Sequence, residues 1–243
     1  MKRVRTLFVV IVTMAIGSTV ALAHPPAGPK WEEMMDAGNL PAFAQPTMGM
    51  GTLSFINGNL GGTISSGELI DFEDMFIINI VDPAMFRATT DEMDGELGNA
   101  FATFDTMLWL FQPGVMADDA FGIVGNNDHP NTGSLQSLLT PITDDGHAGV
   151  VTPGLYYLAI TRFNNVPQSA GLNIFDLDTR TEISGPDGFG GLGAIDGWSG
   201  DGELFVGDYR ISLRGVEFSD IPAPGTICLL GLAVLGNRKR RRR

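Results

Sequence analysis

Hydrophobic and polar residues alternate with a period of two near the end of the chain. Tyr209, Ile211 and Leu213 are separated by the polar residues Arg210 and Ser212. This period places alternate side chains on opposite faces and predicts an antiparallel strand with one buried face. Comparable short apolar runs lie between turns rich in Gly, Asn and Asp. They predict strands at Thr52–Ile56, Phe76–Val81, Phe86–Thr89, Met107–Phe111, Phe121–Val124, Leu155–Arg162, Leu172–Phe175 and Asp208–Phe218.

The pattern between the two ends of the chain contains little helical periodicity. One short helix is expected over Trp31–Asn39, within a proline-rich lead that spans residues 24–50. Many short strands without intervening helices favour two packed antiparallel sheets. We therefore predict an all-β fold, with an antiparallel β-sandwich or jelly-roll-like domain over residues 51–219. The 32 glycines and 14 prolines supply the turns that this fold needs.

The N-terminus has the three parts of a secretory signal peptide. Three basic residues precede an apolar run from Leu7 to Ile16, and Ala21-Leu22-Ala23 follows as a small-residue cleavage pattern. The alternative is a membrane anchor, but the run is shorter than the roughly 20 residues that a span needs. We expect residues 1–23 to form a signal peptide helix that signal peptidase removes after Ala23.

The C-terminus also has three parts. A proline-containing motif precedes an apolar segment over Ile227–Leu235, and a basic cluster ends the chain. Basic residues after an apolar segment stay on the cytoplasmic side of a membrane. The segment predicts a short hydrophobic helix, and an ordinary tail anchor is the alternative. The residues of the motif and of the terminal cluster are Pro222, Ala223, Pro224, Gly225, Arg240, Arg241, Arg242 and Arg243.

This order of motif, apolar segment and arginine-rich end resembles the PEP-CTERM sorting signal of bacteria that make exopolysaccharide. The resemblance covers residues 221–243, and Pro-Ala-Pro replaces the Pro-Glu-Pro of the family name. It implies recognition by an exosortase, a membrane transpeptidase-like enzyme. It further implies an exported protein, transiently held at the membrane, that ends in the cell envelope, at the cell surface or in the extracellular matrix.

The part of the chain between the two signals is strongly acidic. The chain carries a formal charge of −13, and the two signals hold nine of its 15 basic residues and none of its acidic residues. Without them, 6 basic and 28 acidic residues leave a net charge of −22. Such a surface repels nucleic acid and other polyanions unless cations bridge them. The single cysteine, Cys228, lies in the sorting segment, so the domain has no disulfide.

Five segments of the acidic part resemble bacterial pre-peptidase C-terminal domains. They are Glu68–Phe76, Phe104–Phe111, Gly125–Asp128, Gly154–Ile160 and Gly207–Leu213, in the order that the family has. The resemblance implies a jelly-roll-like β-sandwich that is non-catalytic and binds polymer, calcium or a neighbouring domain. The segments over residues 89–102 and 164–207 are longer than in the family.

Acidic and amide side chains border several predicted strands. Hard cations such as Ca²⁺ are bound by six to eight oxygen ligands, which loops at one end of a sandwich can supply. The alternative is that these residues cap turns. A second acidic set within residues 176–203 lacks the spacing of a calcium loop and is expected to be a solvated, flexible loop. The candidate calcium ligands are Asp71, Asp74, Asp105, Asn127 and Asp128.

The motifs of common enzymes are missing or out of context. Gly188, Gly190 and Gly193 match a dinucleotide fingerprint, but no strand and helix are predicted around them. No G-x-S-x-G sequence or histidine metal motif occurs. We predict a non-catalytic surface or matrix protein that acts through binding or cohesion, with exopolysaccharide as a candidate partner and Trp198 as a candidate sugar contact. The alternatives are a calcium-dependent or carbohydrate-binding accessory module and a small secreted hydrolase.

Overall fold

The computed structural model describes residues 29–61, 72–116, 118–200 and 205–219. Regular structure in this part of the chain is β, apart from two 3-10 helices, η1 (Pro41–Phe43) and η2 (Pro83–Met85). The prediction of a β-rich domain is therefore confirmed. The predicted helices of the signal peptide and of the sorting segment lie outside the described residues.

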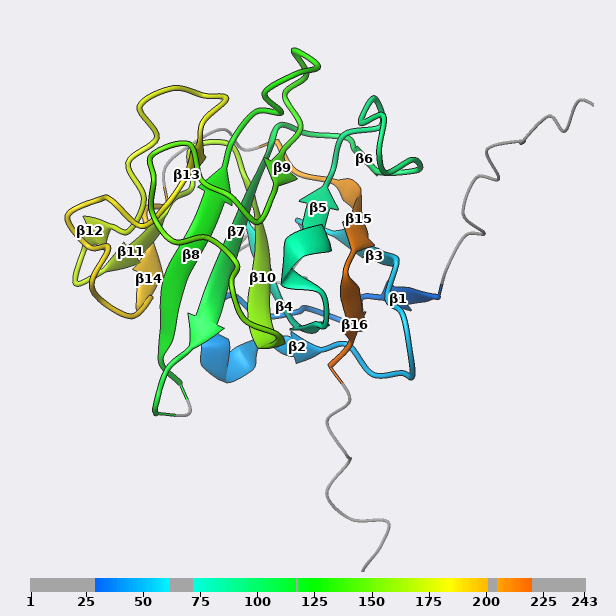
Figure 1. Ribbon diagram of the computed structural model, residues 1–243, viewed down its shortest axis with the longest axis horizontal. Helices are drawn as coiled ribbons and strands as arrows, with labels where there is room; N and C mark the ends of the chain where they lie inside the picture. Colours follow the sequence, from blue (N-terminus) through cyan, green and yellow to red (C-terminus); the bar gives the residue numbers. More distant parts are fainter. Residues whose placement is uncertain (1–28, 62–71, 117, 201–204, 220–243) are drawn as a thin grey trace, which may run out of the picture.

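One sheet has six strands (Figure 1). Its order is β1–β3–β15–β5–β9, and β6 pairs with β15 as well. This sheet carries the candidate site. Its strands are β1 (Lys30–Glu32), β3 (Phe55–Asn59), β5 (Arg87–Thr89), β6 (Phe101–Ala102), β9 (Leu138–Leu139) and β15 (Asp208–Arg214).

A second sheet has seven strands in the order β13–β8–β7–β10–β4–β16, with β2 also paired to β4. A small third sheet has the order β12–β11–β14. The seven strands are β2 (Gln45–Pro46), β4 (Glu73–Ile80), β7 (Thr106–Pro113), β8 (Ala120–Asn126), β10 (Gly154–Arg162), β13 (Ile183–Ser184) and β16 (Val216–Phe218). The small sheet contains β11 (Pro167–Ser169), β12 (Leu172–Asn173) and β14 (Gly197–Trp198).

The prediction of purely antiparallel sheets is wrong at two pairs. β1 pairs with β3, and β2 with β4, in parallel. The chain runs from β1 to β2 in the other sheet and then returns to β3. This excursion supplies the long crossover that a parallel pair requires.

The short helix predicted over Trp31–Asn39 is not formed. Residues 30–32 form β1 instead, because the buried Trp31 side chain joins the core between the sheets. Met35 then adopts a φ of 62°, a left-handed conformation that interrupts any α-helix.

A corner at Gly215 divides the last predicted strand. β15 ends just before Gly215 and β16 begins just after it, so the chain passes from the six-stranded to the seven-stranded sheet. Gly215 has a φ of 74°, and a Cβ there would approach the carbonyl oxygen of Asp82 to 2.6 Å. Only glycine fits both conditions without strain. The predicted alternation of β15 is confirmed, since Tyr209, Ile211 and Leu213 are buried.

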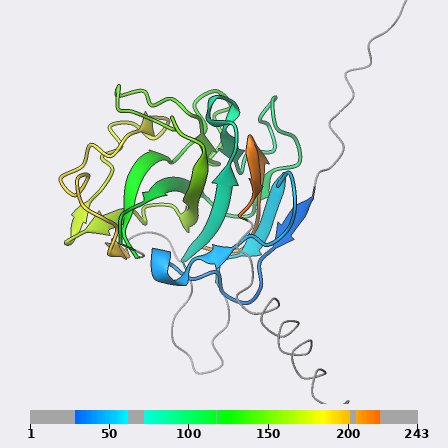
Figure 2. The same ribbon diagram turned by 60° about the horizontal axis from the view of Figure 1, so that its bottom comes forward.

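The seven-stranded sheet is covered on both faces. One face packs on the six-stranded sheet, and its other face carries a second cluster around Trp109 and Phe111. Figure 2 shows this arrangement, with the blue and orange strands on one side of the green strands and the yellow segment on the other. Burial on both faces explains why β7 and β10 have nearly continuous apolar sequences rather than alternating ones.

The long segment after β10 forms this second cover. Within it, Ile174, Phe175 and Ile195 are at most 4% exposed and pack on the sheet. The expectation of a loop free of the core is therefore wrong for its described part, but the expected exposure of its acidic residues is confirmed there. Its acidic residues lie on the outer side, where Asp187 accepts a hydrogen bond from the amide of Asp176 and Asp196 accepts one from Ala170.

Candidate functional site

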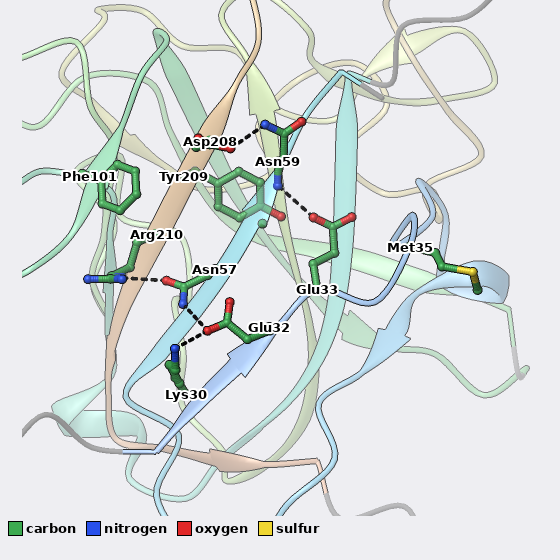
Figure 3. Close-up of a pocket in the computed structure, with 11 residues that line it drawn as sticks. Lys30, Glu32, Glu33, Met35, Asn57, Asn59, Phe101, Asp208, Tyr209 and Arg210 are labelled. Atoms are coloured by element: carbon green, nitrogen blue, oxygen red, sulfur yellow. Dashed lines mark hydrogen bonds and ion pairs between the residues drawn. The ribbon is translucent and has the colours of Figure 1, made fainter. Parts of the chain in front are cut away.

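A polar groove lies on the outer face of the six-stranded sheet (Figure 3). Its volume is about 590 Å³, and β1, β3, β6 and β15 contribute its walls and floor. Strand alternation explains its composition, because Trp31, Ile56 and Tyr209 face the core and their neighbours face outward. The outward neighbours that line the groove are Lys30, Glu32, Asn57, Asn59, Asp208 and Arg210.

One row of side chains crosses four strands of the groove. The strand register places Glu32, Asn57, Arg210 and Phe101 opposite one another in turn. Asn57 Nδ2 donates to Glu32 Oε1 at 3.0 Å, and Arg210 Nε donates to Asn57 Oδ1 at 2.6 Å. The guanidinium of Arg210 lies 5.4 Å from the centroid of the Phe101 ring. We call these four residues the amide–guanidinium row.

A second, shorter row lies beside the first. Asn59 Nδ2 donates to Asp208 Oδ1 at 2.6 Å, and the backbone amide of Asn59 donates to Glu33 Oε2 at 2.8 Å. Below it, the buried Tyr209 hydroxyl donates to Asp74 Oδ2 at 2.5 Å, which fixes β15 against β4. The groove therefore has side chains held in place by one another and by the core beneath them.

Part of the charge in the groove is paired locally. Lys30 forms an ion pair with Glu32. The hydrogen bond from Lys30 is the main reason that the pKa of Glu32 is lowered, and the bond from Asn57 acts in the same direction. Glu32 is therefore a carboxylate at neutral pH, with its oxygens acting as acceptors.

The groove offers donors and acceptors beside partly exposed aromatic rings. Phe55 and Phe101 flank the Arg210 guanidinium, at 5.7 and 5.4 Å from ring centroid to guanidinium carbon. Carboxylates, amides and guanidinium groups hydrogen-bond hydroxyls, and aromatic faces pack on the C–H faces of flat rings. The arrangement suits a ligand that is rich in hydroxyl groups.

The candidate calcium ligands lie at one end of the seven-stranded sheet. Asp105 precedes β7, Asn127 and Asp128 follow β8, and Asp74 is near the start of β4. Asp71 lies outside the described residues. With β7 and β10 between them, β4 and β8 are about 14 Å apart at a spacing of about 4.8 Å per strand. The described candidate ligands therefore lie at the same end of the sheet. Asp74, however, accepts a hydrogen bond from Tyr209 and is too far from Asp128 to share a metal ion with it.

Asp128 has a different partner from Asp74. Its Oδ2 lies 3.8 Å from Nη1 of Arg180, and its burial raises the pKa of its carboxyl group. Among the described residues, no group of three His, Cys, Asp or Glu side chains is arranged to hold a metal ion. Calcium at this end of the sheet stays a prediction.

Trp198 lies half-buried in β14 rather than on an open sheet face. Its Nε1 donates to the carbonyl oxygen of Asn39 at 2.7 Å, and its ring meets Phe111 edge to face with centroids 6.5 Å apart. Both contacts join the second cover to the rest of the domain. The groove residues were not singled out from the sequence, although the alternation in β15 correctly placed Arg210 on the outer face.

A buried histidine follows Asp128 in the chain. His129 is 2% exposed, its Nδ1 accepts a hydrogen bond from the Asn131 amide at 3.1 Å, and its Nε2 lies 3.9 Å from Asp94 Oδ1. Burial lowers the pKa of His129, while the charges of Asp91 and Asp94 oppose that shift. The imidazole is therefore neutral in the folded protein at neutral pH.

This histidine predicts a loss of stability in mild acid. The unfolded chain takes up a proton at His129 near pH 6.5, and the folded chain does so only at lower pH. The free energy of unfolding therefore falls as the pH drops below about 6.5. We expect the urea midpoint to fall between pH 7.5 and 5.5, and to fall less in His129→Gln. An equal fall of the urea midpoint in the wild type and in His129→Gln would show that His129 is not the cause of the pH dependence.

The comparisons with known proteins concern the C-terminus. Residues 220–243 match the family model described as the PEP-CTERM protein-sorting motif. Searches of curated proteins and of solved structures found no match to the chain. Among the described residues, no helix is long and apolar enough to cross a membrane. The chain thus carries a PEP-CTERM sorting motif, which marks it as an exported protein that an exosortase sorts to the cell surface.

Proposed function

We propose that the protein is a non-catalytic glycan-binding protein of the cell envelope or exopolysaccharide matrix. The observation that carries this proposal is the amide–guanidinium row, in which Glu32, Asn57 and Arg210 are fixed by mutual hydrogen bonds beside Phe101. A fixed row binds a ligand without first ordering its own side chains, which lowers the entropic cost of binding.

The charge of the domain favours a neutral polysaccharide. Outside the two terminal signals, the chain has 28 acidic and 6 basic residues. The field of such a surface repels anionic polymers, and the two cations of the groove each have an acceptor already, Glu32 for Lys30 and Asn57 for Arg210. A neutral sugar needs only the hydrogen-bonding groups and rings that the groove presents.

The groove carboxylates support binding rather than hydrolysis. A glycoside hydrolase needs one carboxylic acid whose pKa is raised so that it can protonate the leaving group. The pKa of Glu32 is lowered instead, and Glu33 and Asp208 both accept hydrogen bonds from Asn59. The segments that resemble pre-peptidase C-terminal domains overlap β4, β7, β8, β10 and β15. An accessory binding role is what that resemblance implies.

Arg210→Ala should weaken glycan binding by tenfold or more. The change removes a cation that orients Asn57 and lies over two aromatic rings. A lost charge-assisted hydrogen bond costs about 1.5–3 kcal/mol, and about 1.4 kcal/mol is a tenfold change in affinity. Calorimetric titration of the full chain with dextran, xylan and alginate measures the effect.

Arg180→Ala is the matched control for this experiment, because it removes the same charge from an exposed side chain outside the groove. It should bind glycan like the wild type. If both variants bind equally well, the groove is not the binding site. If binding of alginate alone occurs and is lost on adding a chelator, a calcium bridge replaces the groove as the explanation.

A further inference from the structure

The residue that follows β16, just before the sorting motif, is hydrogen-bonded to a loop near the start of the domain. Ser219 donates from its amide and from its hydroxyl to the carbonyl oxygen of Thr47, at 2.9 and 3.0 Å. Both residues are at most 3% exposed, and Thr47 Oγ1 donates to Ile77 O at 2.7 Å. The folded domain therefore extends to Ser219, immediately before the matched motif begins at residue 220.

We call residues 47–52 the methionine loop, and it wraps around β16. Phe218 donates its amide to the carbonyl oxygen of Gly51, and Thr52 pairs with Glu217. The Phe218 ring lies on Gly49, where a Cβ would come within 2.7 Å of it. These contacts leave the two methionines outside, with Met48 47% and Met50 90% exposed.

The surroundings of the methionine loop are unusual in an acidic chain. Residues 34–52 contain one charged residue, Asp36, and their exposed large apolar side chains include Phe43 at 70%. Figure 1 shows this blue segment, from η1 through β2, along the side of the molecule on which β16 ends. Exposed apolar side chains grouped in a segment with so little charge are typical of surfaces that contact another protein or a membrane.

The sequence after Ser219 indicates that the partner of this surface is a membrane. The apolar segment Ile227–Leu235 begins eight residues later and is followed by a basic cluster that stays on the cytoplasmic side. Eight extended residues reach at most about 29 Å. While the tail is inserted, Ser219 and the Thr47 end of the methionine loop are therefore held within about that distance of a bilayer. We propose that the methionine loop contacts the lipid surface and orients the domain for sorting.

Site-specific fluorescence tests the proposal. In the full chain with Cys228→Ser, Met50→Cys receives an environment-sensitive NBD label, and Leu192→Cys provides a control that is 99% exposed in the second cover. Each protein is added to phosphatidylcholine vesicles, which carry no net charge. We expect NBD emission at position 50 to rise at least twofold and shift to the blue, with no change at position 192.

Three outcomes would overturn the proposal. Equal responses at the two positions would show that the loop does not face the lipid. A full chain that does not float with the vesicles would show that the tail does not bring the loop to a bilayer. A response at position 50 that requires added exosortase would identify a protein surface as the partner. A drop in response when Met48→Asp is added to the labelled chain would support the lipid contact.

Discussion

Trp109→Ala is expected to lower the free energy of unfolding by about 3–5 kcal/mol. The Trp109 side chain is fully buried on the outer face of the seven-stranded sheet. Its Nε1 donates to Thr161 Oγ1 at 3.0 Å, and its ring lies 5.2 Å from Phe175 in the second cover. The substitution creates a large cavity beneath this cover and leaves the Thr161 hydroxyl without its donor.

Urea unfolding followed by circular dichroism measures this effect. Trp198→Ala is the matched control, because the same side chain is removed from a half-buried position at the margin of the same cluster. Trp198→Ala should lower the free energy of unfolding by clearly less than Trp109→Ala does. Trp109→Phe keeps most of the packing and provides a folded variant if Trp109→Ala does not fold. Equal, small losses in Trp109→Ala and Trp198→Ala would mean that residues 164–199 do not form a tightly packed layer.

Asp94→Ala should be comparably destabilising, with an expected loss of about 3–5 kcal/mol. Asp94 and Arg87 form a bidentate pair, with Nε to Oδ2 at 2.9 Å and Nη2 to Oδ1 at 2.7 Å. Their side chains are 2% and 11% exposed. Burial raises the pKa of Asp94, but the hydrogen bonds from Arg87 and from the Glu96 amide outweigh it and lower the pKa below its usual value. Removing the carboxylate leaves a largely buried guanidinium whose remaining acidic partner is the half-exposed Glu96, 3.4 Å away.

Two further variants separate the buried pair from its exposed neighbour. Glu96→Gln changes a half-exposed side chain that lies 3.4 Å from Arg87, and it should cost at most about 1 kcal/mol. The double variant Arg87→Met with Asp94→Leu removes both charges and should be more stable than Asp94→Ala alone. If the double variant is the less stable of the two, an uncompensated charge is not the cause of the loss.

The strands were predictable where the sequence itself carries the information. The strands β4, β7, β8, β10 and β15 lie within or close to the predicted ranges, because each contains a run of mainly apolar residues or a strict alternation. The short strands β1, β2 and β13 have two or three residues, and no periodicity can be read from so few positions. Their positions depend on partners far away in the chain.

The second core layer was missed for a related reason. Ile174, Phe175 and Ile195 are scattered among glycines and aspartates, so composition indicates a solvated loop. The segment is ordered by the apolar outer face of β7 and β10, which only the folded sheet presents. Continuous apolar runs in these strands were the available signal that both faces are covered.

The groove combines residues that are distant in sequence. Arg210 and Asn57 are 153 positions apart and meet only because β15 pairs with β3. Polar side chains on an outer sheet face are common in any β-sandwich, so their types alone do not identify a site. The C-terminal sorting motif was recognised from the sequence, and the family model matches it over residues 220–243, because its three parts lie next to one another and need no fold to be recognised.

We propose above all that the outer groove of the six-stranded sheet binds a neutral glycan. Amide chemical shifts of the isotopically labelled protein, titrated with the neutral polysaccharide that binds best, test it most directly. The largest shifts should occur at Asn57, Asn59, Phe101 and Arg210, with none at Trp198 or Asp128. Shifts centred on Trp198 or on Asp128, or no shifts with any neutral glycan, would contradict it.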